Sequence, residues 1–194
     1  MLDLEPAARR LAHLVTDLPD RALGAPTPCP DYTVGDLVDH IGGMALAFRA
    51  AAAKDDLGPG PAGPSADASR LGGDWRTRIP RDLMALAGAW RDPAAWTGTT
   101  RAGGLELPGE VAGLVALDEL VVHGWDMARA VGRDYDPHPP SLEAVLDFVA
   151  PFAEPGREAS RAGLFGPVVA VPDDAPLLDR VVGLTGRDPA WVPA

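Results

Sequence analysis

The sequence predicts an all-α protein, most simply a helix bundle. Apolar residues recur at helical spacing in several segments, and strand-like segments are too few to build a sheet-based core. The chain has 194 residues, of which 46% are hydrophobic. That is enough for one domain with a sizeable core, or one domain with a short appendage.

The charge and the cysteine count exclude several classes of protein. The formal net charge is −11 and there is one cysteine, so an internal disulfide and a cysteine-only metal site are excluded. Nucleic-acid binding needs clustered Lys and Arg, which this balance disfavours. No apolar run approaches a membrane span, and acids and arginines interrupt the N-terminal stretch where a signal peptide would be apolar. We expect a cytoplasmic protein, a monomer or homodimer, that binds neither nucleic acid nor membrane.

Six helices are expected. They run from Asp3 or Leu4 to about Leu18, from Val34 to about Ala53, from Ile79 or Pro80 to Trp90, from Pro108 to Gly132, from Ser141 to about Phe152, and from Ala175 to Thr185. Pro6 is acceptable only in the first turn of the first helix. Thr33 is the expected N-cap of the second, with Asp36 completing an approximate capping box. Pro108 suits the first position of the fourth helix, and Gly132 suits its end.

The fifth helix is expected to have Ser141 as its N-cap, and its buried face comprises Leu142, Val145, Leu146 and Val149. Between helices, residues 55–73 predict a long mobile loop or lid. Residues 94–104 predict a loop with a short extended piece at 96–100. A strand-like apolar piece is expected at 168–171.

The fourth helix carries an unusual polar stripe. Its apolar residues cover nearly the whole circumference, which is typical of a helix buried on all sides. Glu119 and His123 nevertheless lie one turn apart, and Asp126 follows three residues later. A carboxylate and an imidazole at this spacing can chelate one divalent cation. The alternative is an ordinary ion pair on a helix face that is open to water.

A metal site with protein ligands needs a third side chain, and four residues are candidates. His40 lies at the flank of the apolar stripe of the second helix and can reach a bundle interior, although it can also be a core histidine. His13 and His138 fit solvated positions better. Cys29 precedes the second helix and can serve either as a packing residue or as a thiolate ligand.

Two aspartates of the fourth helix have more than one interpretation. Asp126 can hold the far ring nitrogen of a histidine ligand, or it can pair with Arg129 or Arg133. Asp118 falls on the more apolar face, where an ion pair with an arginine of another helix would explain it.

Three segments resemble a known family. They are TPCPDYTVGDLVDHIGG (27–43), LDELVVHGWDMARA (117–130) and GLFGPVVAVPDDAPLLDR (163–180). Together they are similar to the DinB-like metal-binding family, and within it to the branch related to the metal-binding domain of mycothiol-dependent maleylpyruvate isomerase. Many members have tryptophan where this chain has Tyr32, a difference that concerns packing beside the second helix.

The resemblance implies a DinB-like four-helix bundle over residues 1–154, with residues 155–194 as a short C-terminal appendage packing on it. It also implies a divalent metal, zinc or nickel, held by His40, Glu119 and His123. Three protein ligands leave a coordination position open. In the isomerase relatives the thiol of mycothiol takes that position, and the metal lowers its pKa.

The leading hypothesis is therefore a metal-dependent S-transferase or isomerase that uses mycothiol, a low-molecular-weight thiol, against a small electrophile. Residues 55–73 and 94–104 are candidates for covering the substrate. One alternative is a hydrolase that uses metal-activated water, with Asp126 or Asp118 as base. The other is a metal-binding or regulatory domain without catalysis.

Overall fold

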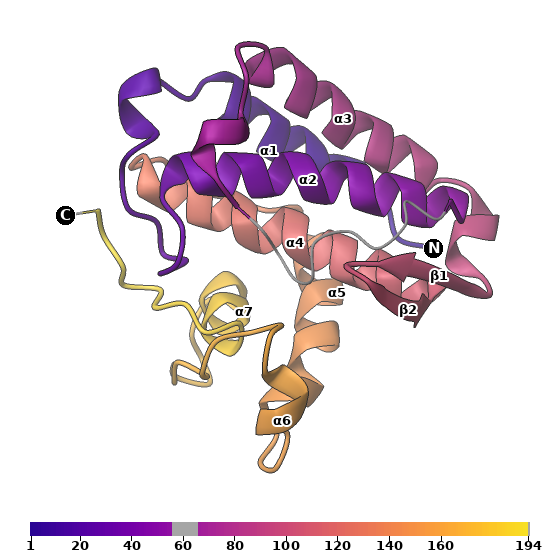
Figure 1. The fold of residues 1–194 in the computed structure, drawn as a ribbon. Helices are drawn as coiled ribbons and strands as arrows, with labels where there is room; N and C mark the ends of the chain where they lie inside the picture. The colour runs from indigo at the N-terminus through magenta and orange to yellow at the C-terminus, as the bar shows by residue number, and fades with distance from the viewer. Residues whose placement is uncertain (56–65, 194) are drawn as a thin grey trace.

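The computed structural model describes residues 1–55 and 66–193, and it is mainly helical (Figure 1). This confirms the mainly helical class, to which the structure adds a small two-stranded sheet. The α-helices are α1 (Glu5–Thr16), α2 (Val34–Ala53), α3 (Trp75–Ala89), α4 (Gly109–Ala130), α5 (Pro139–Val149), α6 (Glu158–Arg161) and α7 (Leu177–Leu184). The sheet consists of β1 (Thr99–Ala102) and β2 (Leu105–Pro108), and the 3-10 helices are η1 (Asp20–Ala22), η2 (Ala68–Arg70), η3 (Pro93–Trp96) and η4 (Ala150–Ala153).

Helix α4 lies at the centre of the packing. Helix α1 packs against α3 and α4, and α2 packs against the same two helices. In Figure 1 these helices occupy the upper part of the molecule, while α5, α6 and α7 lie on the lower side of α4. Helix α5 contacts both α4 and α7. Because α4 has neighbours on opposite sides, its apolar residues are buried nearly all round, as the sequence predicts. In the part of the chain that the structure describes, no helix is long and apolar enough to cross a bilayer.

The second helix begins and ends where the sequence predicts. The side chain of Thr33 accepts a hydrogen bond from the backbone of Asp36, and the carboxylate of Asp36 accepts one from the backbone of Thr33. This capping box satisfies two backbone N–H groups that the first turn of a helix leaves without partners. It fixes the residue at which α2 begins.

The third helix starts earlier than predicted, at Trp75 rather than at Ile79 or Pro80. Pro80 lies inside the helix, where it cannot donate a backbone hydrogen bond. Trp75, Ile79 and Leu83 follow one another at intervals of four residues and are all buried. The burial of this longer apolar stripe offsets the hydrogen bond that Pro80 removes, so the helix continues through the proline.

Residues 94–104 are more ordered than the predicted loop. They contain η3 and β1, and β1 pairs with β2 in an antiparallel hairpin. Gly103 and Gly104 connect the strands, and both have positive φ angles, 57° and 79°. A two-residue connection of this kind matches the twist of a hairpin and favours Gly-Gly. This Gly-Gly pair is the feature of the sequence from which the hairpin could have been predicted.

Three smaller predictions near the chain's C-terminal half need correction. Ser141 is not the N-cap of α5, because the helix already begins at Pro139, and prolines fit a first turn that needs no N–H partners. Pro108 is not the first residue of α4 but lies in the N-cap position just before Gly109, and its side chain makes no capping hydrogen bond. Residues 168–171 form no strand in the described chain. Val169 donates its N–H to Gly183 of α7, so its partner is a helix rather than another strand.

The predicted loop at 55–73 is only partly described, since residues 56–65 lie outside the described residues. The part that follows contains η2, which is attached to α2. The backbone N–H of Ala68 donates to Asp36 at 2.9 Å, and that of Asp67 donates to Asp39 at 3.1 Å. These two aspartates therefore hold the end of the segment against the first turns of α2.

Candidate metal centre

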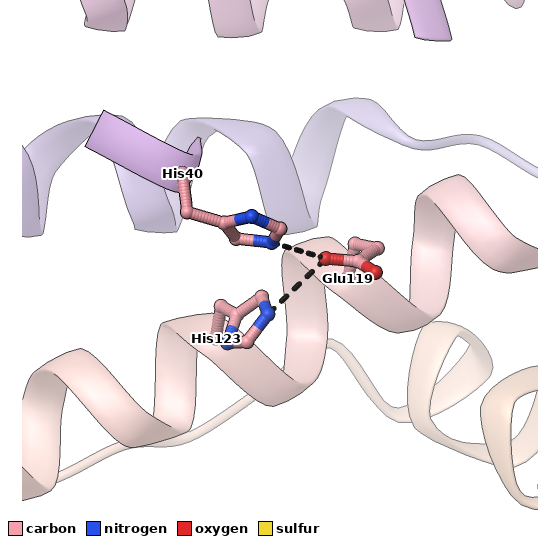
Figure 2. A group of neighbouring side chains, drawn as sticks. All are labelled: His40, Glu119 and His123. Atoms are coloured by element: carbon pink, nitrogen blue, oxygen red, sulfur yellow. Dashed lines mark hydrogen bonds and ion pairs between the residues drawn. The ribbon is translucent and has the colours of Figure 1, made fainter. Parts of the chain in front are cut away.

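Two helices bring His40, Glu119 and His123 together. His40 projects from α2, and Glu119 and His123 project from α4 (Figure 2). The Nε2 atom of His40 lies 2.9 Å from Oε2 of Glu119, and the Nε2 atom of His123 lies 3.1 Å from the same oxygen. The two imidazole rings meet edge to face with their centroids 4.8 Å apart. One ligand atom from each residue lies within 4.8 Å of the other two.

The polar stripe of α4 thus faces α2 and not solvent. His123 is buried, and Glu119 and His40 are partly buried. The helical period explains the pairing within α4, since side chains four residues apart stack on one face. His40 comes from a helix that packs directly on α4. The alternative of an ion pair on an open helix face is therefore wrong, because the carboxylate also binds a residue of a second helix.

The charges of the cluster are strongly coupled. Burial by itself would raise the pKa of Glu119, but hydrogen bonds from His123 and His40 outweigh it and hold that pKa well below its usual range. Burial would lower the pKa of His123, but hydrogen bonds to Asp126 and Glu119 raise it to about 9. Without a metal, the two neighbouring carboxylates therefore favour the protonated form of the His123 imidazole.

Asp126 holds the far side of the His123 ring. The Nδ1 atom of His123 lies 2.9 Å from Oδ2 of the fully buried Asp126. This is the first of the two interpretations offered by the sequence. The second is wrong, because Arg129 donates to backbone carbonyls of the C-terminal segment and Arg133 contacts Asp17. A carboxylate on one ring nitrogen directs the other nitrogen toward a metal, as is usual for histidine ligands.

Arg187 also binds Asp126, a contact that no pattern in the sequence indicates. Its Nη2 atom lies 3.2 Å from Oδ2, and its Nε atom lies 3.4 Å from Oδ1. Burial opposes ionisation of Asp126, yet the guanidinium of Arg187 and the hydrogen bond from His123 keep its pKa below the usual value. The two residues are 61 positions apart, so no helical or strand period connects them.

Asp118 differs from the expected ion pair. It is buried, and its Oδ1 atom has no hydrogen-bond partner among the described residues. Burial and the neighbouring charge of Glu119 raise its pKa to about 7, although Arg187 and His123 oppose the shift. The arginine with the largest effect on it, Arg187, forms its ion pair with Asp126 instead. Asp118 is therefore a buried carboxyl group with no ion pair to another of the described residues.

The remaining candidates lie outside the cluster. His13 and His138 are exposed, as their solvated positions in the sequence predict. Cys29 is not in the group, although Arg187 and Asp126 both affect its thiol, and burial raises the pKa of that thiol to about 11. Tyr32 packs beside the cluster, with its ring centroid 5.5 Å from that of His40. This agrees with a packing role for the position.

The donor set suits a divalent cation. Two imidazole nitrogens and one carboxylate oxygen are common ligands of zinc, which binds them at about 2.0–2.2 Å. Atoms bound to one ion at such distances lie at most about 4 Å apart. Glu119 is already closer than that to both histidines, and all three ligand atoms lie within 4.8 Å of one another. The side chains present therefore fit a metal ion, and His40, Glu119 and His123 are the residues that would hold it.

Fold and cluster together define a mainly helical protein with a His–Glu–His group between two packed helices. Residues 4–128 match the family described as the mycothiol maleylpyruvate isomerase N-terminal domain, and the chain belongs to this family. The match includes all three residues of the cluster and ends before the segment that carries Arg187.

Two relatives from Mycobacterium tuberculosis, in strains CDC 1551 / Oshkosh and ATCC 25618 / H37Rv, are each 27% identical to the chain over 182 residues. The alignment covers 91% of this chain and 91% of each relative, and both relatives are named as uncharacterised proteins. No solved structure was found to match the chain.

Proposed function

We propose that the chain is a divalent-metal enzyme that uses a low-molecular-weight thiol, mycothiol, as its nucleophile against a small electrophile. The reaction would be of the S-transferase or isomerase class. The observation that carries this proposal is the convergence of His40, Glu119 and His123 from two helices, in a chain of the mycothiol maleylpyruvate isomerase N-terminal domain family.

The chain's own residues would hold the ion and keep the ligands in place. His40, Glu119 and His123 supply three donors, which leaves a coordination position for a substrate. A bound divalent metal would lower the pKa of a thiol, so that the thiol reacts as a thiolate at neutral pH. Asp126 would orient His123, and Tyr32 would pack against His40. Imidazole and carboxylate suit both zinc and nickel, and we propose zinc first.

The same family supports a finer description of the fold. We propose that α1, α2, α3 and α4 form the DinB-like four-helix bundle within residues 1–154, and that residues 155–194 are an appendage packing on it. The mutual packing of the four helices supports this proposal.

One of the two loops expected to cover the substrate, residues 94–104, is attached to the far end of α2, where the hydroxyl of Thr100 donates to the carbonyl of Ala51. That carbonyl is eleven residues, or about 16 Å, along the helix from His40.

A metal-dependent hydrolase is the second candidate, and Asp118 is the observation that favours it. A buried carboxyl group with a pKa of about 7 and an unpartnered oxygen has the properties of a general base. Asp126 is a poorer base, because His123 and Arg187 already occupy its oxygens.

Metal content tests the site itself. Elemental analysis of purified protein, after dialysis against zinc or nickel, should find about one ion per chain in the wild type and a large loss in His40→Ala. His13→Ala is the matched control, because this histidine is exposed and outside the cluster. Equal metal content in the wild type and in His40→Ala would reject the site.

A panel of electrophiles, assayed with and without low-molecular-weight thiol, tests the chemistry. Consumption of the electrophile only when thiol is present supports thiol transfer or isomerisation, and consumption without thiol supports the hydrolase. His123→Ala should abolish either activity while circular dichroism shows the helices intact. A protein that binds metal and converts none of the panel would favour a metal-binding or regulatory role.

A further inference from the structure

The C-terminal segment that follows α7 reaches the centre through one side chain. Arg187 spans both carboxylate oxygens of Asp126, at 3.2 Å and 3.4 Å. Its own position is fixed, because its backbone N–H donates to Val182 and its Nη1 atom donates to the carbonyl of Thr185. Its side chain is 12% exposed and that of Asp126 is 0% exposed. The contact is therefore an inward one and not a solvated surface pair.

Asp126 connects Arg187 to His123, one of the three residues of the cluster. The Oδ2 atom of Asp126 lies 3.2 Å from Nη2 of Arg187 and 2.9 Å from Nδ1 of His123. On the opposite side of the same ring, Nε2 of His123 faces Glu119. An aspartate has two rotatable bonds and one carboxylate plane, so a donor on each oxygen fixes its plane. With that plane fixed, the imidazole has one orientation in which Nδ1 keeps its hydrogen bond.

A second arginine attaches the same segment without touching the cluster. Arg129 lies on α4, three residues after Asp126, and its Nη2 atom donates to the carbonyls of Pro189 and Trp191 at 3.0 Å and 2.7 Å. Arg129 therefore contributes to the docking of the segment on α4, whereas Arg187 contributes to docking and also contacts Asp126. The pair separates these two roles experimentally.

We propose that Arg187 is a positioning residue of the metal centre, which acts on His123 through Asp126. The C-terminal segment lies outside the matched residues 4–128. On this proposal it contributes to metal binding through Arg187, in addition to packing on α4. This inference rests on the proposed metal site, and it adds a residue that neither the family match nor the sequence pattern assigns. It predicts that loss of Arg187 weakens metal binding although no ligand changes.

The first test compares zinc affinity, measured by competition with a chromophoric chelator. Arg187→Met should weaken zinc binding by about tenfold or more, the usual effect of losing a group that orients a metal-bound histidine. Arg129→Met should bind zinc nearly as tightly as the wild type, because it removes contacts of the segment with α4 and leaves the contact of Arg187 with Asp126 in place. Asp126→Asn should weaken binding as well. Adding Arg187→Met to Asp126→Asn should cause little further loss, since both changes interrupt the same connection.

A second readout does not require the metal. In metal-free wild type, the Nδ1–H proton of His123 should give a downfield proton NMR resonance that is protected by Asp126, and His123→Gln assigns it by its disappearance. Arg187→Met should broaden this resonance through faster exchange with water, and Arg129→Met should leave it sharp. Circular dichroism checks that each variant folds. Arg187→Lys offers a milder variant if Arg187→Met unfolds, because lysine keeps the charge but lacks the planar fork.

The outcomes are distinguishable. If the wild type binds no zinc, the proposed function fails, and the NMR comparison still decides the role of Arg187. If Arg187→Met and Arg129→Met weaken zinc binding equally, docking of the segment explains the effect and the positioning role is rejected. If Arg187→Met binds zinc as the wild type does and keeps the sharp resonance, the inference is overturned outright.

Discussion

Among the described carboxyl groups, Asp118 lies in an environment that is unfavourable to its charged form. It is 7% exposed, and its Oδ1 atom has no partner in the described residues. A pKa raised from 3.8 to about 7 means that the folded state favours the protonated form. The contribution of this group to stability is thus fully present below pH 3.8 and is lost as pH rises through about 7.

Asp118→Asn should therefore stabilise the metal-free protein at alkaline pH. Asparagine removes the buried charge and keeps the shape, so the gain at pH 8 should be about 1–3 kcal/mol. Near pH 4 the gain should vanish, because the native carboxyl group is then neutral. Urea denaturation at both pH values measures the difference. An equal effect at the two values would contradict the raised pKa.

At the residue scale, the sequence indicates the cluster residues that lie on α4, but not all of the side chains that hold them in place. Glu119 and His123 could be inferred because one helix fixes their spacing, and Asp126 follows on the same stripe. His40 remained one of four candidates on the residues alone, since nothing local determines which side chain of another helix comes near. Arg187 could not be inferred, because its contact with Asp126 depends on how a distant segment folds back onto α4.

At the scale of elements, the start of α2 depends on its capping box. Thr33→Ala should cost about 1 kcal/mol in the free energy of unfolding, because it removes half of the capping box. Hydrogen bonds from Thr33 and from the backbone of Ala68 lower the pKa of Asp36. The contribution of Asp36 is thus present above its ordinary value of 3.8 and is lost as pH falls below it. Urea denaturation should show a smaller difference between variant and wild type near pH 3 than at pH 7.

Close packing of α4 against η3 requires a glycine. A Cβ atom on Gly113 would lie 2.6 Å from the Trp96 ring and 2.9 Å from the Trp90 ring. Gly113→Ala should therefore destabilise the protein by about 1–3 kcal/mol despite the better helix propensity of alanine. Gly43→Ala is the matched control on α2, since no described atom lies within 4 Å of the added Cβ. Thermal denaturation should show the control unchanged or up to about 1 kcal/mol more stable.

Elements whose signal is local were predicted well, and those decided by packing were not. The capping box fixes the start of α2 from adjacent residues, and the glycine at 132 with φ of 66° ends α4. By contrast, the first turn of α3 exists because Trp75 is buried against other helices, which outweighs the local signal of Pro80. Residues 168–171 include strand-forming residues but have no neighbouring strand in the described chain, and Val169 donates a hydrogen bond to α7 instead.

For the whole molecule, metal binding should appear as stability. If the ion binds only the folded chain, zinc at about 100 times its dissociation constant adds about 2.7 kcal/mol to the free energy of unfolding. Chelator-treated wild type should therefore melt at a higher temperature when zinc is restored, in differential scanning calorimetry. His40→Ala should show no such rise, and His13→Ala should respond as the wild type does. A rise in His40→Ala equal to that in the wild type would place the ion elsewhere.

The mainly helical class is predictable because it depends on the summed periodicity of many residues and not on any single contact. The way the C-terminal segment closes on α4 depends on a few specific contacts, made by Arg129 and Arg187. Such contacts leave no periodic trace in a single sequence, so the docking of the segment could not be predicted.

The location of the single thiol has a practical consequence for spectroscopy. Cys29 is the one cysteine of the chain, and its thiol lies within the electrostatic influence of Arg187 and Asp126. A nitroxide attached there would sit near the centre without any mutation. With a paramagnetic divalent ion such as nickel bound, electron resonance could then measure the separation of label and ion. Labelling would be slow, because few thiolates exist at neutral pH when burial raises the pKa to about 11.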